Sequence, residues 1–241
     1  MAHEVEAGFE TTRWSLVVRL RCGEDERRAA LEELARVYRP AVYGYLRRRG
    51  LPPDEADEAT QDFFVSVVFS RGLVERADQD KGRLRTLILT ALQRHETDRH
   101  RRRMARGGPH RSLDASRHEE AMLASELPDD PVQAFERRWA TAQVEEAMRR
   151  CEAHFRAIDK PGHWALFESR YVRPAISPCR APPTAEVSDR FGFRSPADAN
   201  AAVQTVKKRY LAILREVVAE TTCDEAQADN EYESLLSMLA C

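Results

Sequence analysis

The sequence of 241 residues lacks a long hydrophobic run and lacks paired cysteines of the Cys-x-x-Cys type. Its apolar runs, such as residues 87–89, are far shorter than the roughly 20 residues that a membrane helix needs. The N-terminus carries acids where a secretory signal carries basic residues, so we expect a cytoplasmic protein with no membrane partner. The five cysteines are scattered, which argues against a disulfide framework.

Recognisable catalytic and cofactor motifs are also missing. The patterns Gly-x-Ser-x-Gly, Gly-x-x-x-x-Gly-Lys and His-Glu-x-x-His do not occur. Cys151 and His154 have a ligand-like spacing, but together with His163 and Cys179 they would form an irregular metal site, and ordinary packing is favoured. We therefore expect no metal, no cofactor and no enzymatic activity of the chain itself.

Two opposite charge runs are hidden by the net charge of −2. From Asp54 to Asp80, eight carboxylates accompany two arginines, a formal charge of −6. From Lys81 to Arg111, ten basic residues accompany two acids, a formal charge of +8, and His95, His100 and His110 are expected to add to this surface. A dense positive segment attracts phosphates by releasing their condensed counterions, so nucleic acid is the leading candidate partner.

Apolar residues recur at three- and four-residue steps, which predicts helices, and no strand-like alternation persists, so we predict an all-α fold. A first helix is expected to continue, kinked, through Pro40 and to end at Gly50. A second follows Pro52 and Pro53, and a third covers residues 82–103. The residues expected to be buried in these last two helices are Ala56, Ala59, Phe63, Val67, Leu84, Leu87, Ile88, Ala91 and Leu92.

The second half of the chain begins with a polar stretch that lacks periodicity, which we interpret as a linker over residues 106–130. Helices are predicted over residues 132–155, with Phe135, Trp139, Ala142 and Ala147 in its core, and over residues 164–172, closed by Pro174. A short helix over 183–192 and a long one opened by Ser195 then give the outline of a helix-turn-helix with an extended turn.

The sequence thus predicts two small helical domains, over residues 11–105 and 131–222, and a C-terminal helical extension over 223–241. The extension carries Tyr232, Leu235, Leu236 and Leu239 at helical spacing and is expected to pack on the second domain. One hypothesis makes it a switchable cover over the DNA-reading face, because the acids Asp224, Glu225 and Asp229 could mimic phosphates.

Several of these segments resemble the extracytoplasmic-function (ECF) sigma factors, the small promoter-specificity subunits of bacterial RNA polymerase. Residues 57–64, Asp-Glu-Ala-Thr-Gln-Asp-Phe-Phe, resemble the Asp-x-x-Gln-Glu-x-Phe stretch of sigma region 2, and residues 82–88 resemble the Phe-Arg-x-Trp-Leu segment, with Leu84 and Leu87 in place of its aromatic pair. Residues 209–216 resemble the end of the region 4 DNA-reading helix. Residues 12–16 and 135–140 further resemble a planctomycete-type branch.

The resemblance implies a region 2-like helical bundle and a region 4-like helix-turn-helix joined by a flexible linker. The implied partners are the RNA polymerase core and promoter DNA, with an anti-sigma factor or other regulator as a further candidate. An acidic ledge on the second helix would contact the polymerase, with its carboxylates and amide pointing outward. The implied polymerase-binding residues are Asp57, Glu58, Gln61, Asp62 and Phe64.

DNA would be held at two places. Basic side chains of the third helix would hold promoter phosphates, and side chains of the last long helix would face base edges in the major groove, since Asn and Gln pair with adenine and Lys with guanine. Residues 70–82 would accept an extruded base. The implied DNA-binding residues are Lys81, Arg83, Arg85, Arg94, Arg99, Arg101, Arg102, Arg103, Asn200, Gln204, Lys207 and Lys208.

Other interpretations of the same features stay open. The acidic ledge could be a solvated helix face, the basic helix could steer RNA or lipid, and the last long helix could serve packing alone. The rival function is a stand-alone helix-turn-helix regulator that binds DNA and never contacts polymerase. A weaker one is a sigma-like decoy that binds polymerase but opens no promoter.

Overall fold

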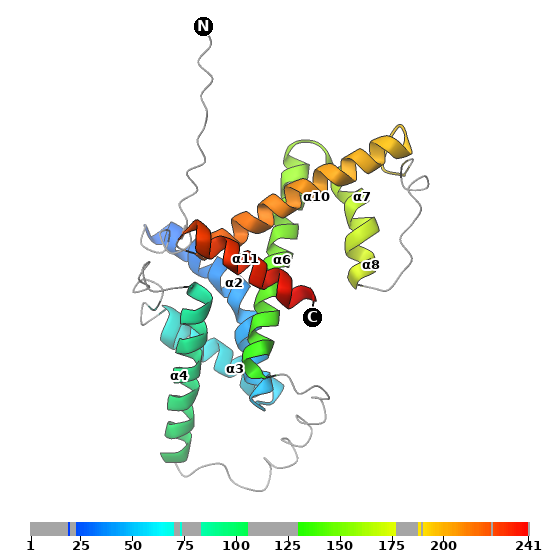
Figure 1. The fold of residues 1–241 in the computed structure, drawn as a ribbon. Helices are drawn as coiled ribbons and strands as arrows, with labels where there is room; N and C mark the ends of the chain where they lie inside the picture. The colour runs from blue at the N-terminus through cyan, green and yellow to red at the C-terminus, as the bar shows by residue number, and fades with distance from the viewer. Residues whose placement is uncertain are drawn as a thin grey trace. The chain divides into compact units, whose positions relative to one another are not determined.

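The computed structural model describes residues 23–69, 83–105, 130–176, 190–222 and 224–240, together with Arg19, Leu73 and Ser188. Throughout these ranges the regular secondary structure is helical, so the fold is all-α, as predicted (Figure 1). Contacts divide the chain into two units, residues 1–142 with 218–241 and residues 143–217. This division differs from the predicted domains, because its boundaries fall inside two long helices.

Among its described residues, the first unit contains four complete helices, a π-helical segment, the start of α6 (Pro131–Ala157) and the last two residues of α10 (Pro196–Ala219). The complete elements are α2 (Glu24–Arg48), α3 (Pro53–Phe63), η1 (Phe64–Phe69), α4 (Leu84–Ala105) and α11 (Glu225–Ala240). None of the described helices is long and apolar enough to cross a lipid bilayer.

Helix α2 shows how local sequence sets the bounds of an element. Its first turn carries Glu24, Asp25 and Glu26 and its last turn carries Arg47 and Arg48, and each charge complements the helix dipole at its end. The helix passes through Pro40, as predicted. It ends before Gly50, whose φ of 89° is a left-handed conformation that glycine adopts without strain.

The core of the first unit follows the predicted stripes. Ala56, Ala59, Phe63 and Val67 are buried, and so are Leu84, Ile88, Ala91 and Leu92, whereas Leu87 is half-buried. Gly44 of α2 allows the start of α6 to come close, since a Cβ there would lie 3.0 Å from Cγ of Arg138. Phe135 and Trp139, both fully buried, are contributed by this part of α6.

The second unit contains the remainder of α6, then α7 (Pro161–Phe167), the π-helical η3 (Glu168–Val172), α8 (Arg173–Ile176) and most of α10 (Pro196–Ala219). The predicted stop at Pro174 is wrong, because the helical segment continues to Ile176. Pro174 lies in α8, which follows the π-helical η3 inside one continuous helical stretch, and a proline there removes one backbone donor without ending the helix.

The start of α10 agrees with its predicted cap. The backbone N–H of Asp198 donates to Oγ of Ser195 at 3.1 Å, the side-chain bond of an N-cap serine. Gly192 precedes it with φ of 77°. Most of the predicted short helix over 183–192 lies outside the described residues. In α10 the expected Val203, Val206, Ile213, Leu214 and Val217 are buried, and Tyr210 is half-buried.

Helix α11 differs from its prediction in place and in buried face. It belongs to the first unit, through contacts with α4 that are described below, and not to the predicted second domain. Leu235 is fully buried, but Leu236 and Leu239 are 44% and 46% exposed. The buried position one turn before Leu235 is Glu231, 1% exposed, so a charged residue occupies the apolar stripe.

Candidate functional site

Four polar side chains of α3 form one exposed surface, which we call the acidic face: Asp57, Glu58, Gln61 and Asp62. All four are exposed, as predicted, because Ala56, Ala59 and Phe63 turn the opposite side of the helix into the core. The apolar stripe fixes the rotation of α3, and so it also fixes which polar residues point outward.

Two members of the acidic face contact side chains of neighbouring helices. A carboxylate oxygen of Asp57 lies 3.0 Å from Nη2 of Arg39 on α2, and both side chains are more than half exposed. A carboxylate oxygen of Asp62 lies 3.2 Å from Nε2 of His95 on α4. Exposed ion pairs of this kind contribute little stability, so Asp57 can exchange Arg39 for a partner's cation at small cost.

Phe64 was expected to contact the polymerase, but it is only 5% exposed. Its ring lies edge-on to Phe63, with centroids 5.7 Å apart, and 5.8 Å from the ring of Phe69. The side chain is therefore part of the core beneath the acidic face and is not available to a partner in this structure. Local sequence gave no sign of this, because η1 begins at Phe64 and its π-helical turn changes the register of buried residues.

A groove of about 610 Å³ lies beside the acidic face. It is lined by Glu32, Ala35, Arg36, Arg39, Pro40 and Tyr43 of α2 together with Asp57. This groove was not predicted, although Pro40 and Tyr43, three residues apart on the predicted first helix, are a signal that could have indicated it. The groove combines apolar residues with charged ones, so it would suit a partner side chain that has an aliphatic stem and a polar end.

His95 was expected on the basic surface but is buried. Its ring lies edge-on to Phe63, with centroids 5.7 Å apart. Burial lowers the pKa of His95, although the nearby Asp62 carboxylate opposes this shift. The imidazole is therefore neutral at neutral pH and supports the acidic face from below.

The C-terminal half of α4 forms the second exposed surface, which we call the basic end: Arg94, Arg99, Arg101, Arg102 and Arg103. Arg94, Arg101, Arg102 and Arg103 are exposed and Arg99 is half-buried. Within it, Arg99 lies 3.3 Å from Glu96, Arg101 lies 3.9 Å from Asp98 and Arg103 lies 3.7 Å from Glu55. A hollow of about 140 Å³ at this end is lined by Arg49, Leu51, Glu96, Arg99, His100 and Arg103. Lys81 lies outside the described residues.

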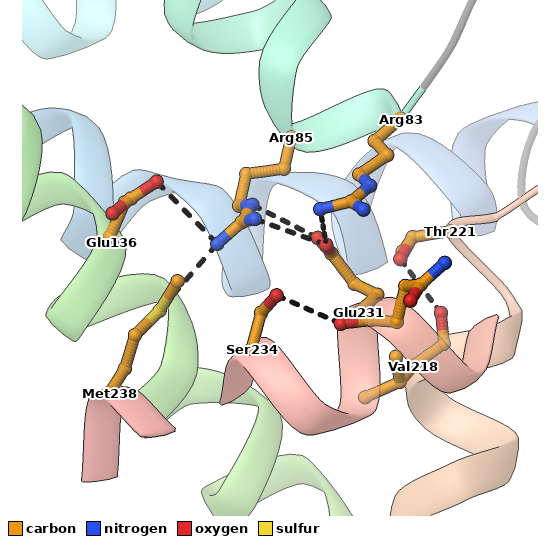
Figure 2. Close-up of polar contacts among 9 residues, drawn as sticks. Arg83, Arg85, Glu136, Val218, Thr221, Glu231, Ser234 and Met238 are labelled. Atoms are coloured by element: carbon orange, nitrogen blue, oxygen red, sulfur yellow. Dashed lines mark hydrogen bonds and ion pairs between the residues drawn. The ribbon is translucent and has the colours of Figure 1, made fainter. Parts of the chain in front are cut away.

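Arg83 and Arg85 were expected to be open to DNA, and the structure contradicts this for Arg85, which is 7% exposed. Its Nε and Nη2 lie 2.9 Å and 3.0 Å from the two carboxylate oxygens of Glu231 on α11 (Figure 2). Arg83, one-third exposed, donates to the same carboxylate at 2.8 Å. The two arginines are occupied because a glutamate distant in sequence reaches the start of α4.

The surroundings of Arg85 complete this cluster. Its guanidinium carbon lies 4.5 Å from the ring centroid of Trp139, a cation–π arrangement, and Nη1 lies 3.7 Å from Glu136. Nη1 also donates to the sulfur of Met238 at 3.5 Å. Burial raises the pKa of Glu231, against the opposing effect of Arg85 and Arg83. We call Arg83, Arg85 and Glu231 the arginine–glutamate cluster.

On α10, the side chains expected to read DNA lie at positions i, i+4, i+7 and i+8 of one helix. Asn200, Gln204 and Lys208 are exposed. Lys207 is half-buried, with its ammonium 4.1 Å from the ring centroid of Tyr171. Three of the four are therefore accessible to a partner, while Lys207 contacts an aromatic ring of its own unit.

Cys151, which was considered as a metal ligand, is buried. Burial raises the pKa of Cys151 to about 11, so its thiol stays protonated and unreactive. Across the described parts of the chain, no group of three or more metal-ligating side chains comes together.

The acids Asp224, Glu225 and Asp229, which were predicted to mimic phosphates, are exposed. The acid that contacts the arginines of α4 is instead Glu231, which was not among the predicted phosphate mimics.

Comparison with protein-family models, with curated proteins and with solved structures finds no match. The features that point to a function are therefore the motifs of the sequence, the acidic face, the basic end and the exposed side of α10.

Proposed function

We propose that this chain is a sigma factor of the ECF type, which binds core RNA polymerase and directs it to promoter DNA. The observation that carries the proposal is the acidic face, with Asp57, Glu58, Gln61 and Asp62 all exposed in the segment that resembles sigma region 2. Complementary charge sets the encounter rate and the register of a complex, and the buried stripe of α3 holds these residues in one orientation.

DNA binding is the second half of the proposal. The basic end presents five arginines that can hold phosphates, which position a chain on a duplex without specifying sequence. Asn200 and Gln204 of α10 would pair with adenine edges and Lys208 with guanine. Such a protein works where the polymerase does, in the cytoplasm, and the chemistry of RNA synthesis belongs to the polymerase.

The competing function is a DNA-binding regulator that never contacts polymerase. The accessible side chains of α10 suit both functions, so the acidic face decides between them. The double substitution Asp57→Lys and Asp62→Lys should abolish association with purified core polymerase in a pull-down and leave duplex DNA binding at least as tight. The matched control is Glu26→Lys with Glu145→Lys, which makes the same charge change on exposed sites outside this face.

Retention of polymerase binding by the Asp57 and Asp62 variant, or loss of it in the control, would contradict docking through the acidic face. Run-off transcription with core polymerase and a genomic promoter library, with and without the chain, tests the activity itself. A chain that associates with polymerase but yields no transcripts would instead be a decoy.

A further inference from the structure

The arginine–glutamate cluster has the geometry of an anion-binding site that is already filled. Arg85 presents Nε and Nη2 to the two oxygens of one carboxylate, the parallel arrangement with which arginine also binds phosphate. Arg83 adds a third contact to the same group. Both arginines stand at the N-terminal end of α4, where the helix dipole favours an anion.

We propose that Glu231 is a built-in substitute for a nucleic-acid phosphate, so that α11 must leave the start of α4 before Arg83 and Arg85 can hold DNA. This inference deepens the proposed function and rests on its DNA-binding half. It assigns a DNA phosphate as the ligand of these two arginines, and it assigns α11 as the element that keeps them from DNA.

The Glu231 carboxylate makes the contacts of α11 with Arg83 and Arg85 that a phosphate would have to replace. The apolar contribution of α11 to the core is narrow, since Leu235 is fully buried while Leu236 and Leu239 are close to half exposed. The side chain of Glu231 is 1% exposed, and burial raises its pKa although Arg85 and Arg83 act in the opposite direction. A buried ion pair adds little net stability because the desolvation of both charges offsets their attraction, so an anion that takes the place of the carboxylate while Glu231 returns to water can compete with it.

When Glu231 leaves, Arg83 and Arg85 become available to a phosphate. Arg85 would keep Trp139 beneath its guanidinium and Glu136 nearby, so it would remain oriented when the carboxylate departs. Phosphate is the better competitor, because a duplex offers several phosphates and their release of counterions adds to the affinity. The alternative is that Glu231 only stabilises the fold.

The first test compares Glu231→Gln with Glu233→Gln in the full chain. Both remove one negative charge from α11, but Glu233 is exposed. Affinity for a fluorescent duplex is measured by anisotropy over a salt series. We expect Glu231→Gln to bind about tenfold more tightly than Glu233→Gln, a typical coupling between two sites, with a slope of log affinity against log salt steeper by about two, one unit for each freed arginine.

The second test loosens α11 without changing charge and so covers the case in which Glu231→Gln folds poorly. Leu235→Gln removes a buried apolar side chain, and Leu236→Gln makes the same change at the exposed neighbour. We expect only Leu235→Gln to tighten duplex binding. In the wild-type chain, amide hydrogen exchange within α11 should accelerate when DNA is added.

Equal affinities within both pairs, or unchanged exchange of α11 in the DNA complex, would overturn the proposal. DNA binding by none of the variants would overturn it as well, because the freed arginines would then hold no phosphate. The polymerase pull-down is scored separately, so a failure of polymerase docking can be told from a failure of this inference.

Discussion

The imidazole of His95 is enclosed between the ring of Phe63 and the carboxylate of Asp62, which belongs to the acidic face. Burial is the largest influence on its pKa and lowers it, while Asp62 and Glu96 act in the opposite direction. A single buried proton site thus lies directly under the surface that we propose to meet the polymerase. Its charge state affects both the stability of the fold and the field of that surface.

The depressed pKa of His95 predicts a loss of stability on acidification. Between the folded pKa and the ordinary value of about 6.5, the unfolded chain binds more protons than the folded chain, so falling pH favours unfolding. This stabilisation is complete above about pH 6.5 and is lost as the pH falls through the folded pKa. Thermal unfolding midpoints measured between about pH 5 and pH 8 should therefore fall less steeply in His95→Gln than in the wild type.

His100→Gln is the matched control, since His100 is exposed on the same helix and should keep the wild-type dependence. His163 also has a pKa lowered by burial, so it contributes a slope of the same sign in all variants. The measured quantity is consequently the difference between the His95 and His100 variants. Parallel curves for the two would refute a buried, neutral His95.

At the scale of single elements, periodicity and caps predicted the helices well where the information is local. The bounds of α4 and α6, the end of α2 and the starts of α3 and α10 fall within a few residues of expectation, because prolines, glycines and an N-cap serine mark helix ends. Even so, the same rules placed Arg85 and His95 outside the core. Both fall on the apolar stripe of α4, and their burial depends on partners from other helices.

In helix α11, too, the buried face depends on partners that are distant in sequence. Its leucines suggested a stripe through Leu235, Leu236 and Leu239, but the buried side of the helix passes through Glu231 and Leu235. A glutamate is acceptable there only because Arg83 and Arg85 lie opposite, about 150 residues earlier in the chain. No rule that scores hydrophobicity along one segment can supply that information. The exposed residues of the acidic face could thus be predicted from the sequence. The contacts of the arginine–glutamate cluster could not.

The exposed side of α10 predicts unequal contributions from two adjacent lysines. Lys208 is exposed, whereas the ammonium of Lys207 lies over the ring of Tyr171. Lys208→Ala should weaken duplex binding by about 1–3 kcal/mol if it reads a base, with a smaller loss in Lys207→Ala because that lysine first has to leave the ring. Competition anisotropy with matched duplexes measures both, and a greater loss for Lys207 would contradict the assignment.

At the scale of the whole molecule, the net charge of −2 conceals two exposed surfaces of opposite sign at different places on the first unit. The acidic face lies on α3 and the basic end lies on the C-terminal half of α4. Surfaces of opposite sign suit partners of opposite sign, a cationic protein surface and a polyanion. If the two surfaces act independently, substitutions in each should affect one partner and spare the other.

Replacing Arg101, Arg102 and Arg103 with glutamine should therefore weaken duplex binding and leave the polymerase pull-down unchanged, the reverse of the Asp57 and Asp62 substitution. Each phosphate contact that is lost should reduce the slope of log affinity against log salt by about 0.9. The control replaces Arg28, Arg156 and Arg173, which are exposed on α2, α6 and α8. It carries the same change in net charge, so an equal loss of slope would show that total charge governs binding and that the basic end does not. A parallel loss of polymerase binding in the first triple variant would mean that the two surfaces are not separate, and it would favour one continuous interface over two partners.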